Sequence, residues 1–358
     1  MNRRLRDAER GPAGSPRVQQ RPGTAPVTTV IDTDTGVDDA VALALAANSP
    51  ELDVSALTTV AGNAEVGECT RNVLLLAGEL WRDTPPRVAE GADRPLDKRL
   101  TTAPEVHGID GLGGVRATLP TPALAPLDKA AYTVLSETLR GHATPTAAPG
   151  RSLLVATGPL TNLALALRFD PHALDGFERI VIMGGALDVP GNTGPVAEFN
   201  FYVDPEAADI VLRSGLDITV VPLDATTMVH LTRERLEALP RWNDSLRRAA
   251  GPASEWGSGM TLVGATLARA LDYYIRYQAE ESGLDAGYMH DPVAVAAAFA
   301  PGLVGTREIA LSVVADGPER GRSIPTDDAR PPVRVALNAD RAGVLDLIYA
   351  RVLLPLFG

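Results

Sequence analysis

Short apolar runs with β-branched residues alternate along the chain with longer runs whose apolar positions recur every three or four residues. The short runs predict strands, at 27–31, 52–60, 85–88, 152–156, 179–183 and 218–223. The longer runs predict helices between them, at 38–47, 66–80, 128–139 and 204–214, with one more ending at residue 168. Such alternation is typical of a largely parallel sheet with helices on both faces. We therefore expect a single-domain α/β fold with a Rossmann-like, largely parallel (mixed) open sheet.

The pattern becomes purely helical between residues 232 and 287. This segment and its C-terminal border gather many aromatic residues, although these make up only 4% of the chain: Trp242, Trp256, Tyr273, Tyr274, Tyr277 and Tyr288. They either form a helical pack that buries its aromatics or a lid that stacks on a planar ligand. Further on, the pattern predicts a helix opened by His290, a strand pair at 309–314 and 333–337, and a terminal helix at 340–353.

Charge and composition narrow the classes of partner. A net charge of −12 and an isoelectric point of about 4.9 argue against binding to nucleic acid or anionic membranes. The 358 residues, 45% of them hydrophobic, suffice for a large core. A single cysteine excludes an intramolecular disulfide, and no apolar run reaches transmembrane length. We therefore expect a cytoplasmic protein without nucleic-acid or membrane partners.

The first 25 residues differ from the rest of the chain. Six arginines lie there among Gly, Pro, Gln and Ser, and the apolar run of a secretory signal is missing. Because this composition cannot build a core, we expect a disordered tail at 1–25, followed by the catalytic domain at 26–358.

Four carboxylates fall within eight residues between the first predicted strand and the first helix: Asp32, Asp34, Asp38 and Asp39. In an open α/β sheet, this end of a strand is where ligands bind. Carboxylates packed this closely repel one another, so some would protonate unless a cation lies among them. All-oxygen ligands suit Ca²⁺ or Mg²⁺. The turn therefore indicates a metal site, while the simpler alternative is a solvated acidic turn that caps the helix.

Polar residues follow the later strands as well: Asn63, Thr157, Asn192, Glu198, Asn200 and Asp224. A doubly wound sheet places such positions along one edge, so we expect them to form one site together with the acidic turn.

In this order, the motifs resemble those of the nucleoside hydrolase family, the inosine–uridine-preferring ribohydrolases. The family's DxDxGxDD motif matches residues 32–39, and six further signatures follow in order, at 60–63, 107–111, 157–162, 183–185, 191–200 and 290–292. The resemblance spans residues 27–353. It departs at Thr35, where many members carry proline, and the segment 240–288 fits no fixed pattern, which leaves the base preference open.

The resemblance implies hydrolysis of the N-glycosidic bond of ribonucleosides to ribose and free base, with Ca²⁺ as cofactor. It implies that Asp34, Asp39 and Asp291 bind Ca²⁺ by their side chains and Thr157 by its backbone carbonyl. The ribose contacts it implies are Asp38, Asn192, Glu198 and Asn200, with Asn63 and Met183 lining the sugar pocket. Since family members are commonly dimers or tetramers, we also expect a homodimer or homotetramer.

Cleavage of a glycosidic bond passes through an oxocarbenium-like state and needs an activated water. A carboxylate that touches both metal and water is placed to be the general base for a Ca²⁺-bound water, and we assign this role to Asp34. His290, beside the implied ligand Asp291, is the candidate acid for the departing base. Its alternatives are a helix cap and a tyrosine of the 273–288 segment as the acid.

Three further polar residues have weaker assignments. We expect His107, in a glycine-rich loop that we take to be flexible, to close over the substrate. Asp32 is expected to support the ligands rather than bind the metal. For Asp224, support of the site and a purely structural role at a strand end are equally open.

Two functions of other classes remain as alternatives. A Mg²⁺-dependent phosphatase with a nucleophilic aspartate also carries a DxDx[TV] motif after its first strand. Here Gly36 stands at the fifth position, and the pair Asp38-Asp39 would be unexplained. A non-catalytic Ca²⁺-dependent ribose- or nucleoside-binding protein would not require Asp34. Release of free ribose from a nucleoside separates these alternatives from hydrolysis.

Overall fold

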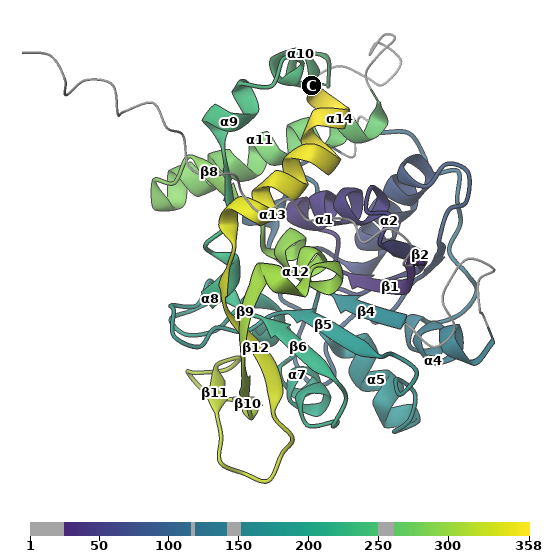
Figure 1. Ribbon diagram of the computed structural model, residues 1–358, viewed down its shortest axis with the longest axis vertical. Coiled ribbons are helices and arrows are strands. Elements are labelled where there is room, and N and C mark those ends of the chain that lie inside the picture. Colours follow the sequence, from purple (N-terminus) through teal and green to yellow (C-terminus); the bar gives the residue numbers. More distant parts are fainter. Residues whose placement is uncertain (1–24, 116–118, 142–151, 250–260) are drawn as a thin grey trace, which may run out of the picture.

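The computed structural model describes residues 25–115, 119–141, 152–249 and 261–358, so the predicted tail lies outside it apart from residue 25. An eight-stranded mixed sheet forms the centre of one α/β domain, with strand order β3-β2-β1-β4-β5-β6-β12-β9 (Figure 1). These strands are β1 (Val27–Thr33), β2 (Leu52–Thr59), β3 (Arg87–Ala89), β4 (Ser152–Ala156), β5 (Arg179–Met183), β6 (Ile218–Val221), β9 (Val304–Ile309) and β12 (Val333–Ala339). Only β9 runs antiparallel to its neighbour, which confirms the predicted mixed, largely parallel sheet.

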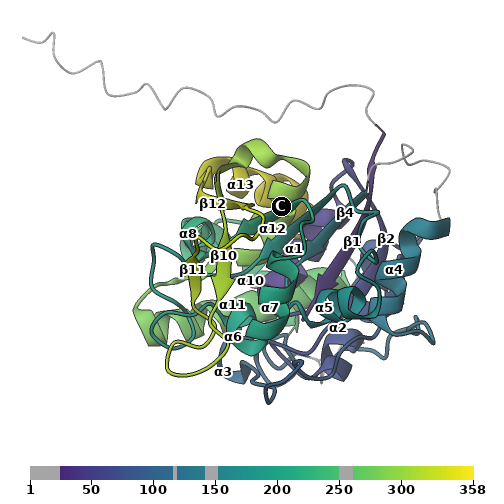
Figure 2. The same cartoon turned by 90° about the horizontal axis from the view of Figure 1, so that it is seen from below.

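Helices cover both faces of the sheet, as predicted (Figures 1 and 2). One layer contains α1 (Val37–Ala47), α2 (Val66–Leu80), α11 (Leu262–Ser282), α12 (His290–Phe299) and α13 (Arg341–Ile348). The other contains α4 (Ala131–Gly141), α5 (Thr161–Phe169) and α7 (Pro205–Leu212). Neighbouring strand residues serve opposite layers: Leu154 belongs to the α5 core and Val155 to the α1 core. Burial on both faces explains why the strands read as continuous apolar runs.

Short elements complete the described part of the chain. They are α3 (Pro104–His107), α6 (Phe199–Val203), α8 (Leu223–Thr226), β7 (His230–Thr232), α9 (Arg233–Glu237), α10 (Trp242–Ala249), β8 (Ala286–Tyr288), η3 (Pro301–Leu303), β10 (Leu311–Val313), β11 (Ser323–Pro325), the π-helical η4 (Tyr349–Leu353) and α14 (Leu354–Phe357). Among the described helices, none combines the length and apolarity that crossing a bilayer requires.

The predicted pairing of residues 309–314 with 333–337 is wrong. The partner of β12 is β9, with Ile309 opposite Val333, whereas β10 pairs with β11. The sequence pattern concealed β9 because residues 305–308 are exposed at the sheet edge and therefore carry no apolar alternation.

Other boundaries differ at the polar turns. The polar run 188–200, whose composition indicates a loop, ends in α6, and the predicted strand at 218–223 ends at Val221, before α8. The helix expected at 128–139 begins at Ala131. The Pro/Ala-rich run 143–150, whose composition indicates a linker, lies outside the described residues. Two of these differences, α6 and α8, place additional backbone beside the site described next.

Candidate active site

The acidic turn lies at the carboxyl end of β1, where its aspartates are buried. Asp38 and Asp39 belong to the first turn of α1, and Asp291 belongs to the first turn of α12, which packs against α1. One carboxylate oxygen from each of these three residues lies within 4.8 Å of the other two. The fold thus brings carboxylates from the N-terminal and C-terminal parts of the chain into one cluster.

Hydrogen bonds connect Asp34 and Asp39 of the acidic turn to neighbouring parts of the sheet. Asp34 Oδ2 accepts a hydrogen bond from the backbone N–H of Asn63 at 2.8 Å, while Oδ1 is buried without a partner among the described residues. Asp39 accepts hydrogen bonds from the hydroxyls of Thr33 and Thr157, at 2.6 and 2.7 Å. A buried oxygen without a partner is costly. Asp34 Oδ1 is therefore available to bind a cation, and Asp32 Oδ2 is the other oxygen of the turn without a partner among the described residues.

Burial and mutual repulsion control the charge of these groups. Burial, followed by the charge of Asp39, raises the pKa of Asp38 to about 7 and that of Asp34 well above its usual range. Burial and then the charge of Asp38 raise the pKa of Asp291 in the same way. A divalent cation would favour the ionised forms and use the free oxygen of Asp34. The residues present therefore fit a hard cation with oxygen ligands.

Asp32 has a different environment from the other aspartates of the turn. Its Oδ1 accepts hydrogen bonds from Thr58 and Asn162, at 2.5 and 2.8 Å, and burial raises its pKa to about 7. Asp32 therefore joins β1 to β2 and α5, which fits the expected supporting role.

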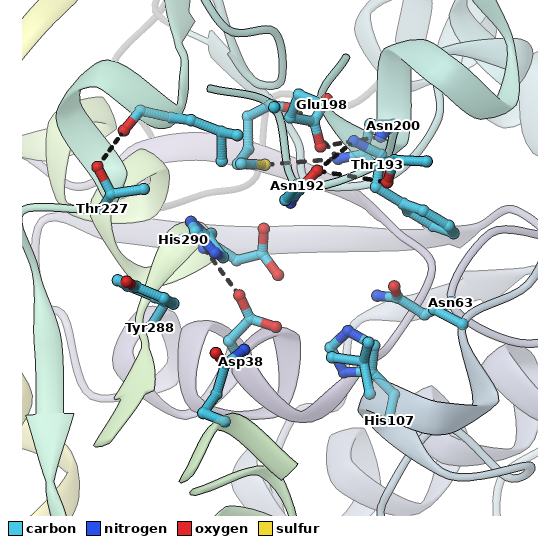
Figure 3. A pocket seen from close by; sticks show the side chains of 18 of the residues that line it. Asp38, Asn63, His107, Asn192, Thr193, Glu198, Asn200, Thr227, Tyr288 and His290 are labelled. Atoms are coloured by element: carbon cyan, nitrogen blue, oxygen red, sulfur yellow. Dashed lines mark hydrogen bonds between the residues drawn. The ribbon is translucent and has the colours of Figure 1, made fainter. Parts of the chain in front are cut away.

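A cavity of about 520 Å³ opens beside the cluster, a size suited to a small ligand (Figure 3). Its walls include all the predicted substrate-binding residues: Asp38, Asn63, His107, Met183, Asn192, Glu198 and Asn200. Thr157, His290 and Asp291 also line it, whereas Asp34 and Asp39 are not among the lining residues. The fold thus brings residues more than 200 positions apart in the sequence together at one edge of the sheet.

The upper wall in Figure 3 carries the polar groups of the β5–α6 segment. Glu198 caps α6 by accepting hydrogen bonds from the backbone N–H groups of Asn200, Gly185 and Phe201, at 2.8, 3.0 and 3.1 Å. Asn200 Nδ2 donates to the carbonyl oxygen of Thr157 at 2.8 Å. Burial raises the pKa of Glu198 to about 7 although its N–H partners oppose the change. Carboxylate acceptors and amide donors of this kind suit a vicinal diol.

The expectation of a flexible loop at His107 is wrong. His107 ends helix α3, is buried, and stacks on Tyr274 with ring centroids 5.7 Å apart. Its Nδ1 accepts the backbone N–H of Val37 at 3.1 Å, and burial lowers its pKa to about 3. The neutral ring therefore carries its proton on Nε2, where it serves as a hydrogen-bond donor.

His290 is half-buried and faces the cavity (Figure 3). Its Nδ1 lies 2.7 Å from the hydroxyl oxygen of Thr226, and its ring stacks on Tyr288 at 5.3 Å. Burial lowers the pKa of His290 to about 4, so the imidazole is neutral at pH 7.

The helical pack is confirmed for part of the aromatic segment, whereas a lid that stacks on a planar ligand stays a prediction. Trp242 is buried edge-on against Phe357, with centroids 5.1 Å apart, whereas Tyr274, Tyr277 and Tyr288 line the cavity. Trp256 lies outside the described residues.

Several other residues that line the cavity were not predicted from the sequence. Gln278 and Glu281 share a helical face with Tyr274, at spacings of four and seven residues, and this period was available in the sequence. Leu223 and Thr227 at α8 also line the cavity, but Leu223 had been taken as the end of a strand and Thr227 was given no role.

Asp224, whose role was open, accepts hydrogen bonds from the backbone N–H groups of Leu187 and Asp188, at 2.9 and 2.8 Å. It therefore fixes the start of the segment that carries Asn192 and Glu198, which favours support of the site over a purely strand-end role.

Comparisons with known proteins agree with this geometry. The sequence model of the inosine-uridine preferring nucleoside hydrolase family matches residues 29–346. A probable uridine nucleosidase 2 of Arabidopsis thaliana is 36% identical over 90% of this chain and 97% of its own length. A pyrimidine-specific ribonucleoside hydrolase RihA of Shigella boydii is 38% identical with the same coverages. The solved plant nucleoside hydrolase PpNRh1 superposes with a TM-score of 0.76 at 36% identity, covering 92% of this chain and all of that one.

Proposed function

Because the chain belongs to the inosine-uridine preferring nucleoside hydrolase family and is thus an N-glycosidase, we propose that it hydrolyses pyrimidine ribonucleosides such as uridine to ribose and free base. The observation that carries this proposal is that one cavity lies beside a buried carboxylate cluster and is also lined by Glu198 and Asn200, groups suited to a diol. The pyrimidine preference rests on the names of the two curated relatives, which are a uridine nucleosidase and a pyrimidine-specific hydrolase.

The proposed cofactor is Ca²⁺, held by the side chains of Asp34, Asp39 and Asp291 and the carbonyl of Thr157. The free oxygen of Asp34 and the proximity of Asp39 to Asp291 support this set. When bound, Ca²⁺ supplies a Lewis acid that orients the attacking water and lowers its pKa.

Asp34 is the proposed general base. The water oxygen forms a bond to C1′ of the ribose, the bond from C1′ to the base nitrogen breaks, and that nitrogen keeps the electron pair. The proton leaves the water for the carboxylate of Asp34. General bases of this kind typically contribute about 10²–10⁴-fold to the rate.

Around the reacting carbon, the proposed ribose contacts are Asp38, Asn192, Glu198 and Asn200. Asn63 and Met183 line the sugar pocket, and His107 donates from Nε2. His290 assists the departing base, whose charge develops as the bond breaks. Since its ring is neutral at pH 7, it acts as a hydrogen-bond donor to the base rather than as an imidazolium.

The test is a substrate panel given to the purified protein: uridine, cytidine, inosine and nitrophenyl phosphate. Free ribose released from uridine or cytidine, faster than from inosine, supports the proposal. The comparisons do not favour the two alternatives, and the panel checks both. Phosphate released from nitrophenyl phosphate would indicate the aspartate-nucleophile phosphatase, and uridine binding without ribose release would indicate the non-catalytic binding protein.

A further inference from the structure

The short helix α8 is the element of the site that the sequence pattern concealed, and it lies directly after β6. It is fixed on one side, because Leu223 N–H donates to the carbonyl of Gly185 at 2.9 Å and Asp224 binds the N–H groups of the same segment. Its last residue, Thr226, is fully buried and faces His290. The helix is thus a rigid support between the β5 turn and the start of α12.

The hydrogen bond between Thr226 and His290 favours one direction. Among the described residues, His290 Nδ1 is the one partner that the Thr226 hydroxyl contacts within hydrogen-bond distance. A buried hydroxyl is best satisfied when it donates its proton, and Nδ1 is the acceptor within reach at 2.7 Å. When Nδ1 accepts this proton it carries none of its own, so the ring proton resides on Nε2.

Other contacts hold the face of the His290 ring and the backbone next to it. Tyr288 stacks on the ring with planes 27° apart, and the β7–β8 pair holds Tyr288 opposite His230. Met289 N–H donates to the carbonyl of Val229 at 3.0 Å. These contacts limit rotation of the ring but do not distinguish Nδ1 from Nε2. Within the described part of the chain, the contact that makes this distinction is the one with Thr226.

We propose that Thr226 is a positioning residue that sets the tautomer and orientation of His290, so that Nε2–H points at the departing base. This inference rests on the proposed function, because it needs a leaving base in the cavity. Thr226 itself does not line the cavity and touches no substrate. Its whole effect on the reaction should therefore pass through His290.

The experiment is a double-mutant cycle with Thr226→Val, His290→Ala and the combined variant. Valine keeps the shape of threonine and removes the hydroxyl. We expect Thr226→Val to lower kcat on uridine by about 10–100-fold, the usual cost of removing a partner that orients a functional histidine. The KM for uridine should stay within about twofold, and a nitrophenyl riboside, whose leaving group needs no assistance, should lose less than threefold.

Two comparisons separate positioning from a structural effect. The combined variant should be no slower than His290→Ala, since Thr226 has nothing left to position. Thr226→Ser should restore most of the rate, because it restores the hydroxyl. The matched control is Thr266→Val, another fully buried threonine, whose hydroxyl bonds only its own helix backbone.

The inference fails if Thr226→Val, folded and metal-loaded, hydrolyses uridine at the wild-type rate. It also fails if both substrates lose equally or if the two mutations multiply in full. These results differ from failure of the proposed function, in which the wild-type protein itself would release no ribose.

Discussion

At the residue scale, the carboxylate of Asp34 carries the chemical argument. Its two oxygens differ: Oδ2 is fixed by the N–H of Asn63, and Oδ1 is buried and free. A carboxylate with one anchored and one free oxygen holds its geometry while it binds a metal and takes a proton.

We expect Asp34→Asn to lower kcat on uridine by at least about 10²–10⁴-fold while the protein stays folded. The amide keeps the size of the carboxylate but cannot accept the proton, and it weakens the metal site. Steady-state kinetics with circular dichroism checks this, with the exposed Asp285→Asn as control. A folded, metal-loaded variant with near-normal turnover would remove Asp34 from the mechanism.

Two substrates with different leaving groups test the role of His290 in the departure of the base. A uracil anion is a poor leaving group, whereas nitrophenolate departs unaided, so His290→Ala should slow uridine by about 10²-fold or more and nitrophenyl riboside by only a few-fold. Asn200→Ala should slow both substrates alike, because they share the ribose. The measurement is kcat/KM for each pair. Equal losses in His290→Ala would make His290 structural and turn attention to Tyr274, Tyr277 and Tyr288.

At the element scale, the sequence predicts those parts of the site whose composition is unusual. The acidic turn and the polar ends of β2, β4 and β5 carried enough Asp, Asn and Glu to be recognised. Asp38, Asn63, Asn192, Glu198 and Asn200 line one cavity, and Asp34 and Asp39 lie behind it in the buried carboxylate cluster. The four-residue helix α8 was not recognisable, because Val221-Pro222-Leu223 continues an apolar run and nothing local separates a strand end from one helical turn. Which of β9 and β10 pairs with β12 depends on contacts across the sheet, and the local sequence pattern does not encode such contacts.

A second element, the C-terminal segment η4–α14, is held to the body of the domain by Arg351. This side chain makes a bidentate ion pair with Glu51 at 2.7 and 2.9 Å, bonds Ser49, and lies over the ring of Phe299. Burial tends to raise the pKa of Glu51, but the hydrogen bonds and charge of Arg351 outweigh it and hold that pKa below its ordinary value of 4.5.

Arg351→Gln should therefore lower the free energy of unfolding at pH 7 by about 1 kcal/mol, since the pair is partly exposed and screened. A pKa lowered in the folded state contributes stability above the ordinary pKa and loses it as pH falls through the folded value. The difference between wild type and variant should shrink between pH 5 and pH 3. Urea unfolding at both pH values tests this. An unchanged difference would contradict the role of the ion pair.

At the scale of the whole molecule, the carboxylate cluster brings together residues from the first and last thirds of the chain. Asp34 and Asp39 precede Asp291 by about 250 residues, yet α1 and α12 pack together and bring Asp39 and Asp291 into the cluster. A cation bound there should stabilise the folded state over the unfolded chain, in which no such cluster exists.

We therefore expect about one calcium ion per chain in protein purified without added metal, and a fall in both Tm and activity after chelation. Calcium should restore both. Elemental analysis and thermal melts with and without a chelator provide the measurement. Full activity and an unchanged Tm in demonstrably calcium-free protein would contradict the proposed cofactor.

The central claim is that this protein cleaves the N-glycosidic bond of a ribonucleoside by adding water. The most direct measurement is the reaction of uridine in phosphate-free buffer made with ¹⁸O-water, with mass spectrometry of the products. Hydrolysis should give equal amounts of uracil and ribose and newly incorporated ¹⁸O at C1 of the ribose, and Asp34→Asn should form these products at least about 10²-fold more slowly. Ribose formed only when phosphate is supplied, ribose without ¹⁸O beyond what exchanges in a ribose control, or no cleavage at all would contradict it.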